Sequence, residues 1–354
     1  MTTLSSSAAS RAKRLANLFP AGVPTLWCPL LTHYDSNGAI DRVRMAAHLR
    51  HLAPHVKGFL IPGSTGDGWE LDETETRALL DLALDEVARL NLHLLIGVLK
   101  TDAAEMRHTV LDTLSRLKTR TGATENETAL RQAHVCGFTI CPPRGKELSQ
   151  TEIETALVGV LELGLPTTLY QLPQITQNEI SPELSLSLAR RFANFLFFKD
   201  TSGADRVANV NRDLDGVFLV RGAEGDYARW LRAGGGPYHG FLLSTANCFG
   251  RELHQIESDL SAGRAAAANE LSLRLTTVVN EAFRIVAGHP HGNAFANANK
   301  AMDHFFAHGP AAAKIAPPRL HAGSRLPEPF IRAIGELLSA HGFMPAKGYL
   351  REPI

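Results

Sequence analysis

The stretch Phe195–Gly203 (FLFFKDTSG) carries the fold prediction. Four apolar residues precede Lys199, and an apolar run of this length is typical of a buried strand. Side chains alternate along a strand, so Lys199 is expected to share one face with Phe195 and Phe197, while Asp200 lies on the other. The polar residues that follow at once indicate that the strand ends here.

Lys199 is therefore a candidate nucleophile. Burial disfavours the charged ammonium, and its pKa would have to fall by about 3 from about 10.4, roughly 4 kcal/mol, for the amine to be largely neutral at pH 7. A neutral amine can attack a carbonyl carbon and form a Schiff base. Taken alone, this segment is more typical of a lysine that is simply the first solvated residue after a strand.

Apolar strand patterns alternate with helix patterns along most of the chain. Predicted strands lie at 22–31, 58–62, 93–99, 138–141, 167–172, 195–199, 217–220 and 241–244. Predicted helices lie at 41–53, 72–90, 102–117, 150–163, 181–192, 204–213, 225–233 and 251–261. Eight such repeats predict an α/β fold of the (β/α)8 TIM barrel type. An open doubly wound sheet is the alternative, but no GxGxxG motif follows the first strand.

Only helix patterns follow the barrel, at 265–286, 294–306 and 328–341. The predicted organisation is a segment at 1–20, the barrel at 21–262, and a C-terminal helical extension at 263–354 packed on the barrel. A polar stretch at 118–132 is predicted to be an inserted or lengthened connection.

Composition narrows the function. The 36 basic and 36 acidic residues give a formal net charge of zero, which argues against nucleic acid or an acidic membrane surface as the main partner. No apolar run reaches the roughly 18 residues that span a bilayer. The four cysteines have neither CxxC nor paired metal-ligand spacing, as expected of reduced thiols in a cytoplasmic protein.

The N-terminal region has two readings. Residues 1–34 contain no acid and include a Ser-rich run with Arg11, Lys13 and Arg14, a composition found in organellar targeting segments. The same residues are equally compatible with a short helix at 11–19 that leads into the first strand.

The predicted carboxyl ends of the strands bring together an amine, a phenol and hydrogen-bonding groups. In a TIM barrel, chemistry is built at this face. The Gly63–Gly66 turn could cradle an anion or be a tight turn only. Tyr170 is a candidate proton donor and acceptor, or else a core tyrosine. Beside Lys199, the later strands end in Arg221, Gly222, Glu224, Ser244, Thr245 and Asn247. His289 and His291 are predicted to be loop residues, and Trp27, Trp69 and Trp230 packing residues.

At these positions the chain resembles the class I, Schiff-base lyase family that includes dihydrodipicolinate synthase and N-acetylneuraminate lyase. Five motifs over about residues 20–305 carry the resemblance: Gly63-Ser64-Thr65-Gly66-Asp67, Tyr170-Gln171-Leu172-Pro173, Lys199-Asp200-Thr201-Ser202-Gly203, Gly222-Ala223-Glu224 and Ser244-Thr245-Ala246-Asn247. Each motif is weak alone, but five in the family's order are specific.

The resemblance implies a role for each matched residue. Lys199 would form the imine with pyruvate or another 2-keto acid, Tyr170 would move protons, and Ser64 would belong to the hydroxyl relay. Substrate binding is implied for Gly63, Thr65, Gly222, Glu224, Leu242 and Ser244. No metal and no cofactor beyond the covalent imine are implied, and a homo-oligomer (dimer or tetramer) is expected.

Two departures from the family pattern bear on the substrate. Where dihydrodipicolinate synthases have an arginine for the semialdehyde carboxylate, this chain has Ile175, and where they have a tyrosine pair it has Pro143-Arg144. We therefore expect an aldolase or dehydratase that acts on a 2-keto-3-deoxy sugar acid or a similar substrate. The alternatives are a synthase-type condensation of pyruvate with an aldehyde, and a non-catalytic 2-keto acid-binding regulator.

Overall fold

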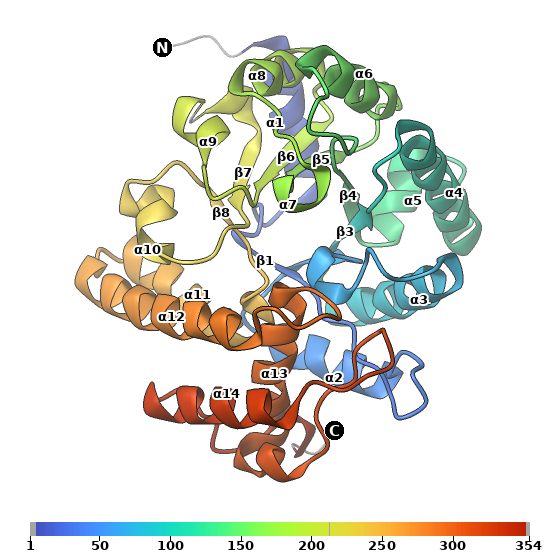
Figure 1. Ribbon diagram of the computed structural model, residues 1–354. Helices are drawn as coiled ribbons and strands as arrows, with labels where there is room; N and C mark the ends of the chain where they lie inside the picture. The colour runs from blue at the N-terminus through green and yellow to red at the C-terminus, as the bar shows by residue number, and fades with distance from the viewer. Residues whose placement is uncertain (1–4, 212, 352–354) are drawn as a thin grey trace. The chain divides into compact units, whose positions relative to one another are not determined.

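The computed structural model describes residues 5–211 and 213–351. Parallel strands close a barrel in sequence order, which confirms the predicted TIM barrel (Figure 1). The strands are β1 (Leu26–Pro29), β2 (Gly58–Ile61), β3 (His93–Val98), β4 (Val135–Ile140), β5 (Thr167–Gln171), β6 (Phe195–Asp200), β7 (Phe218–Arg221) and β8 (Gly240–Leu242). The first strand is shorter than predicted: residues 22–25 and 30–31 lie outside it.

Helices separate the strands and continue after them. They are α1 (Ser6–Leu18), α2 (Arg42–Leu52), α3 (Glu73–Leu90), α4 (Ala103–Thr121), α5 (Asn126–Gln132), α6 (Gln150–Leu161), α7 (Pro173–Thr176), α8 (Pro182–Arg191), α9 (Arg206–Val210), α10 (Tyr227–Trp230), α11 (Ala246–Ser261), α12 (Ala265–Val286), α13 (Ala294–His308) and α14 (Glu328–Ala340). Asp41 and Asp72 cap α2 and α3 through their side chains. Within the described chain, no helix is long and apolar enough to cross a membrane.

Some element predictions were wrong in detail. The polar stretch at 118–132 is largely helical: α4 continues to Thr121, Gly122 ends it at a φ of 72°, and α5 follows. Helix α11 begins at Ala246 rather than at Arg251, and the short helix α7 was not predicted at all. Polar composition misled in the first case, because a solvent-facing helix has few apolar residues to mark it.

The chain packs as two compact units that alternate along the sequence. The first comprises the chain up to Trp27, His93–Ala223 and Trp230–Leu242, and the second comprises Cys28–Leu92, Glu224–Arg229 and the chain from Leu243. The predicted division into 1–20, 21–262 and 263–354 stays a prediction.

Aromatic rings fill the core of the first unit. Phe19, Trp27 and Phe197 contact one another with ring centroids 5.4–6.0 Å apart, and each is at most 2% exposed. Edge-to-face pairs of this kind add about 0.5–1.5 kcal/mol each to the burial of their area. Phe197 thus lies in a packed core, two residues before Lys199 on the same strand face.

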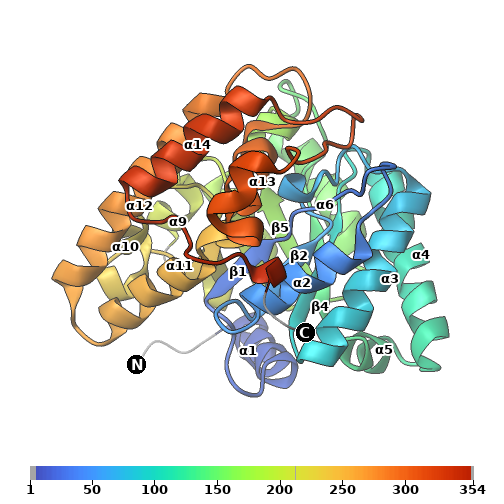
Figure 2. The same cartoon turned by 90° about the horizontal axis from the view of Figure 1, so that it is seen from below.

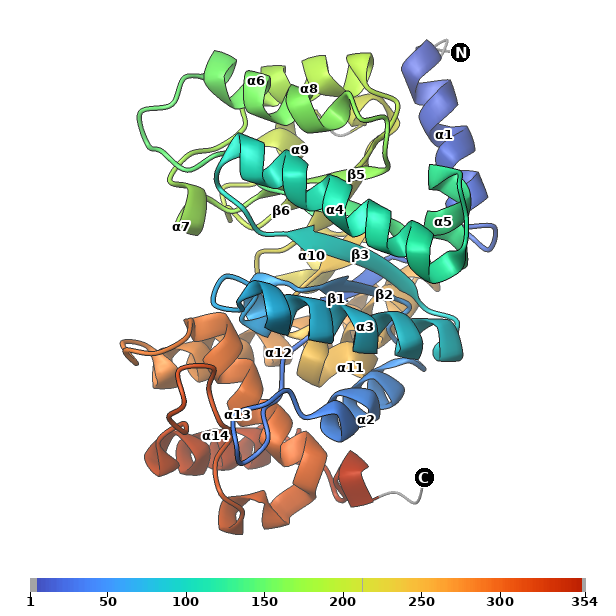
Figure 3. The same cartoon turned by 90° about the vertical axis from the view of Figure 1, so that its right-hand side faces the viewer.

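Helix α1 is joined to the first unit through Arg11, and Figure 3 shows it alongside α5. The Arg11 side chain is fully buried, and its Nε donates to the carbonyl oxygen of Phe195 over 2.6 Å. Its two Nη atoms donate to the carbonyls of Ala189 and Phe192 and to Asp215. A basic residue that the composition could assign to targeting therefore has a packing role in this fold.

The second unit contains a helical layer made of α11–α14, which can be followed in Figure 2. Its close packing depends on Gly335 in α14, where an added Cβ would lie 2.5 Å from Cζ of Phe305. Phe249 of α11 contacts Phe343 and Phe306 edge-on at centroid distances of 5.1 and 5.3 Å. These contacts hold the helical layer as part of one core.

Replacing Arg11 with glutamine should lower the free energy of unfolding by about 3 kcal/mol, because buried carbonyls and Asp215 lose their donors. Denaturant unfolding followed by circular dichroism measures this. The exposed Lys13 on the same helix is the matched control, and Lys13→Gln should change stability by less than about 0.5 kcal/mol. A loss below about 1 kcal/mol for Arg11→Gln would contradict the assigned role.

Candidate active site

Lys199 and Tyr170 lie side by side in the first unit. They occupy paired positions on β6 and β5, and each is 2% exposed. The Lys199 Nζ lies over the Tyr170 ring, 3.9 Å from its centroid. An amine and the ring of a phenol are thus in contact inside the fold, and these are two groups that imine chemistry can use.

Gly222, directly after β7, is set against Lys199. A Cβ at this position would lie 3.1 Å from Cε of Lys199 and 2.3 Å from Cγ2 of Thr201. Only glycine permits this approach, so the strand-seven glycine is required for packing against the lysine chain. Its amide donates to the carbonyl of Asp200 over 2.7 Å.

Two further buried residues belong to this unit. Cys141 follows β4, and burial raises the pKa of its thiol to about 12 although the charge of Lys199 acts in the opposite direction. The thiol is therefore protonated at neutral pH. Leu242 ends β8 and is 1% exposed.

Asp200 belongs to a buried polar network that the sequence reasoning missed. The Tyr238 hydroxyl bonds to Asp205 at 2.6 Å and to Asp200 at 3.3 Å. Arg221 donates through Nε and Nη2 to the two oxygens of Asp205 at 3.0 and 3.2 Å. One signal was available: an arginine that ends the apolar run Phe218–Arg221 needs a buried acid as its partner.

The Gly63–Asp67 turn lies in the second unit and is tightly packed. A Cβ on Gly66 would lie 2.3 Å from the carbonyl oxygen of Leu30, and one on Gly63 would lie 2.8 Å from Cβ of Pro29. The amides of Gly66 and Gly68 both donate to the Gly63 carbonyl at 3.0 Å. These two amides are therefore used within the turn, so an anion cradle would have to draw on other donors.

Ser64 and Thr65 occupy a single 3-10 turn, Ser64–Gly66. The Ser64 hydroxyl accepts a bond from Nε1 of Trp69 at 2.8 Å, and its carbonyl accepts from Nδ2 of Asn293 at 3.0 Å. Trp69 was predicted to be a packing residue, but it also orients the serine. Thr65 is 4% exposed.

Asp67 closes the turn in a left-handed conformation at a φ of 57°. Its carboxylate pairs with the buried Lys300 of α13 and accepts a bond from the Tyr34 hydroxyl at 3.0 Å. Burial, and then the charge of Asp67, raise the pKa of Tyr34 above its usual range. Neither Tyr34 nor Lys300 was singled out from sequence, since both are distant from the motif in the chain.

Glu224 and Ser244, predicted separately as substrate contacts, are directly bonded within the second unit. The Ser244 hydroxyl donates to Glu224 at 2.7 Å, and the Thr245 amide donates to the same oxygen at 3.1 Å. The Tyr227 hydroxyl donates to the other oxygen at 3.1 Å, and Asn299 donates to the Ser244 hydroxyl. Glu224 is thus a carboxylate held in place by donors on several elements.

Among the described residues, His33, His48 and Asp303 form a group whose ligand atoms lie within 4.8 Å of one another. The His33 Nε2 and His48 Nδ1 are 3.0 Å apart, and the His48 Nε2 lies 2.9 Å from the Asn247 carbonyl. Asp303 accepts bonds from Arg44 at 2.9 Å and from the Tyr349 hydroxyl. A guanidinium on the single carboxylate disfavours a divalent cation, so this group fits a hydrogen-bonded core network.

The two positions on which the substrate prediction rests follow strands β4 and β5. Ile175 is half-buried on α7, and Arg144 is exposed.

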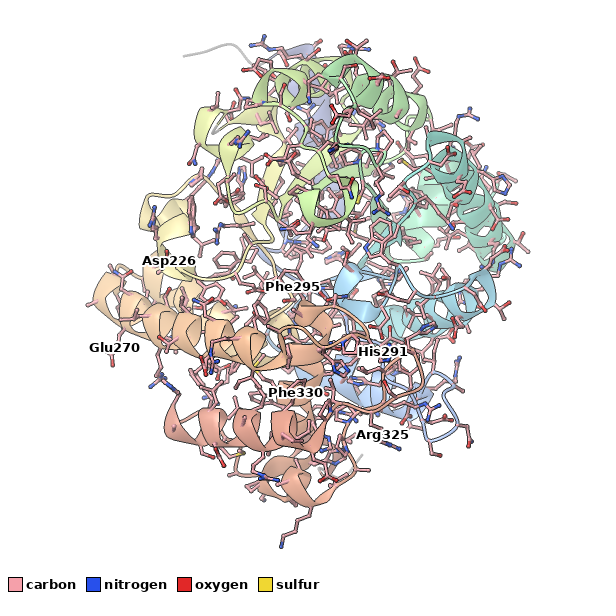
Figure 4. The ribbon with its side chains drawn as sticks, in the orientation of Figure 1. Asp226, Glu270, His291, Phe295, Arg325 and Phe330 are labelled. Atoms are coloured by element: carbon pink, nitrogen blue, oxygen red, sulfur yellow. The ribbon has the colours of Figure 1, made fainter. Side chains whose placement is uncertain are left out.

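His291, labelled in Figure 4, lies on the loop before α13, where its ring contacts that of His289 at a centroid distance of 5.9 Å. The loop prediction for the two histidines is confirmed.

Comparisons with known proteins agree on one family. The model of the dihydrodipicolinate synthetase family matches residues 117–291. A 4-hydroxy-tetrahydrodipicolinate synthase of Agrobacterium fabrum is 24% identical over 261 residues, which cover 73% of this chain and 81% of the relative. YagE of Escherichia coli, provisionally named a 2-dehydro-3-deoxy-D-gluconate aldolase, is 27% identical over 197 residues, or 55% of this chain and 58% of the relative.

The crystal structure of YagE from E. coli K12 in complex with pyruvate matches the fold with a TM-score of 0.70 and 20% identity, over 90% of this chain and 99% of that one. The barrel and the ordered motifs therefore agree with the family match. Over residues 117–291 the chain is similar to the dihydrodipicolinate synthetase family, and over most of its length its fold is similar to that of YagE.

Proposed function

We propose that the protein is a lyase that forms a Schiff base between Lys199 and a 2-keto acid, with a 2-keto-3-deoxy sugar acid as the substrate class. The observation that carries this proposal is the buried Lys199 amine, 3.9 Å from the centre of the Tyr170 ring and packed against Gly222. A buried lysine next to a phenol has the two groups that imine chemistry requires.

The chemistry follows from this pair. The Lys199 amine adds to the keto carbon and water leaves, which gives a protonated imine that accepts an electron pair. In C–C cleavage, the electrons of the bond that breaks form an enamine. In dehydration, a C–H bond next to the imine carbon loses its proton, the electrons of that bond form the enamine, and the enamine then expels the substrate hydroxyl, which leaves as water. In C–C cleavage, Tyr170 takes the proton of the substrate hydroxyl and then returns a proton to the enamine carbon. Hydrolysis restores the free amine and releases the keto acid.

The other predicted residues would orient the substrate. We assign Ser64 to the hydroxyl relay with Tyr170, and Thr65 and Gly63 to the substrate carboxylate. Gly222 and Leu242 would shape the space around the imine. A fixed carboxylate orients the bond that breaks, which is an entropic contribution to the rate.

Glu224 and Ser244 support a hydroxylated substrate tail. The Glu224 carboxylate is preorganised by the donors from Ser244, Thr245 and Tyr227. A carboxylate keeps further acceptor sites after three bonds, so it can accept a substrate hydroxyl without reorganising. Ile175, at the position of the family's arginine, offers no partner for a second carboxylate.

Two alternative functions are distinguished by the same experiments. Relatives named 4-hydroxy-tetrahydrodipicolinate synthase favour a condensation of pyruvate with an aldehyde, and Ile175 argues against it. A regulator that binds a 2-keto acid without turnover is the other. The cytoplasmic location, the homo-oligomeric state and the lack of an external cofactor stay predictions.

Replacing Lys199 with alanine should abolish covalent trapping of pyruvate by borohydride, because the variant loses the amine that would form the imine. Intact-protein mass spectrometry measures the adduct. The exposed Lys100, just beyond the end of β3, is the matched control, and Lys100→Ala should trap pyruvate normally. An adduct that persists in Lys199→Ala, or none in the unchanged protein, would overturn the proposal.

Replacing Tyr170 with phenylalanine should lower kcat by about 100-fold or more, because the ring beside Lys199 is kept and the proton-transfer group is lost. Pyruvate release from a panel of 2-keto-3-deoxy sugar acids gives the rate, and release of water without pyruvate identifies a dehydratase. Turnover within about threefold of the unchanged protein would remove Tyr170 from the mechanism. An adduct on Lys199 with no turnover of any panel member would favour the regulator.

The protein should not condense pyruvate with aspartate semialdehyde, because a carboxylate buried next to Ile175 would lack a cationic partner. The assay follows semialdehyde consumption in the presence of pyruvate, with pyruvate alone as the control. Turnover comparable to that on the sugar acids would instead support the synthase-type alternative.

A further inference from the structure

Directly behind Lys199, on the other face of β6, four polar side chains are buried: Asp200, Asp205, Arg221 and Tyr238 are at most 4% exposed. The proposed reaction does not use them. Buried charges are costly unless they are paired in good geometry, so a cluster that includes two carboxylates calls for a physical account.

Arg221 joins the loops that follow β6 and β7. Its fork binds both oxygens of Asp205, beyond β6, and its Nη1 donates to the carbonyl of Ala223, beyond β7, at 2.7 Å. The guanidinium also lies over the Trp230 ring, 4.3 Å from its centroid. A planar guanidinium can make the carboxylate, carbonyl and ring contacts together, which a lysine cannot.

These two loops also determine where Lys199 lies. Gly222 is held between Arg221 and Ala223, and its backbone faces Cε of Lys199 and Cγ2 of Thr201. The Thr201 hydroxyl donates to the Gln171 carbonyl on the β5 side at 2.5 Å. The lysine side chain is thus bounded by the Tyr170 ring and by Gly222, whose position depends on its two neighbours.

We propose that Arg221, paired with Asp205 and bonded to Ala223, is a positioning residue for Lys199: it locks the loops after β6 and β7 so that Gly222 holds the amine against Tyr170. The inference rests on the proposed function, because the property that Arg221 would control is imine formation. Arg221 acts through Gly222 and does not touch the reacting atoms.

The charged and titratable groups around Asp200 predict how the effect of replacing Arg221 should depend on pH. Burial raises the pKa of Asp200 to about 6, bonds from Ser202 act against this, and the charges of Asp205 and Glu179 add to it. The Tyr238 hydroxyl and Arg221 complete the surroundings. Without the guanidinium, Asp205 keeps the Tyr238 hydroxyl that also bonds to Asp200, and the repulsion between the two carboxylates is relieved when Asp200 takes a proton.

The test measures the rate of borohydride trapping of pyruvate on Lys199 in Arg221→Gln, relative to the unchanged protein. We expect a loss of about 10- to 100-fold that grows as the pH rises from about 5 to about 8. In sugar-acid turnover, kcat should fall while KM changes little, because Arg221 does not contact the substrate. Arg221→Lys keeps the positive charge but loses the planar fork of donors. It should therefore restore the pH profile of the unchanged protein more fully than it restores the trapping rate.

Arg11→Gln is the matched control, since Arg11 of α1 is another buried arginine but binds the opposite end of β6, at the Phe195 carbonyl. It should lose stability and keep the trapping rate of its folded fraction within about twofold. Tyr238→Phe removes the hydroxyl between the two carboxylates and should lower the trapping rate in the same direction, so the test survives if Arg221→Gln fails to fold.

The outcomes separate the inference from the proposed function. If the unchanged protein traps pyruvate and folded Arg221→Gln or Tyr238→Phe traps it at the same rate and pH profile, the positioning role is wrong and the lyase proposal stands. If the unchanged protein forms no adduct, the lyase proposal falls. Hydrogen exchange in peptides over 200–205 and 220–223 then decides the loop-locking role, which fails unless exchange is faster in Arg221→Gln than in Arg11→Gln.

Discussion

The burial of β6 along its whole length is the constraint on which the first unit depends. All six residues from Phe195 to Asp200 are buried, although two of them are charged types. An arginine binds near each end of β6. Arg11 donates to the carbonyl of the first residue of the strand, and Arg221 binds Asp205 in the loop that follows the strand. A lysine can be held within such a strand because its neighbours are fully buried and packed.

Buried charges recur in both units, and three of them meet clear partners. Arg11 meets carbonyls and Asp215, Arg221 meets Asp205, and in the second unit Lys300 meets Asp67. Removing one partner of such a pair leaves the other uncompensated, whereas replacing both with apolar groups is often neutral. Their value to this protein therefore lies in fixing the geometry of turns that carry the motif residues, since an apolar core would stabilise those turns without orienting them.

The paired contacts also explain why individually weak motifs occur together. Gly222 is needed because a side chain would collide with Lys199 and Thr201, and Gly66 because one would collide with the Leu30 carbonyl. Glu224 and Ser244 are partners in one hydrogen bond before any substrate arrives. The motif residues are thus constrained by contacts within the fold as well as by the chemistry proposed for them.

Sequence alone determined the barrel and most helix starts, because apolar periodicity is a local signal. The juxtaposition of Tyr170 with Lys199 was expected from the strand ends of the barrel and from the family resemblance. It could not identify Asp205, Tyr238, Tyr34 or Lys300 as partners, since each contact joins residues that are distant in the chain or separated by a loop. It also misjudged residues 118–132, where a polar helix has the composition of a loop. Tertiary structure alone decided which charges are buried and what pairs them, because burial and hydrogen-bond geometry arise only when distant segments pack together.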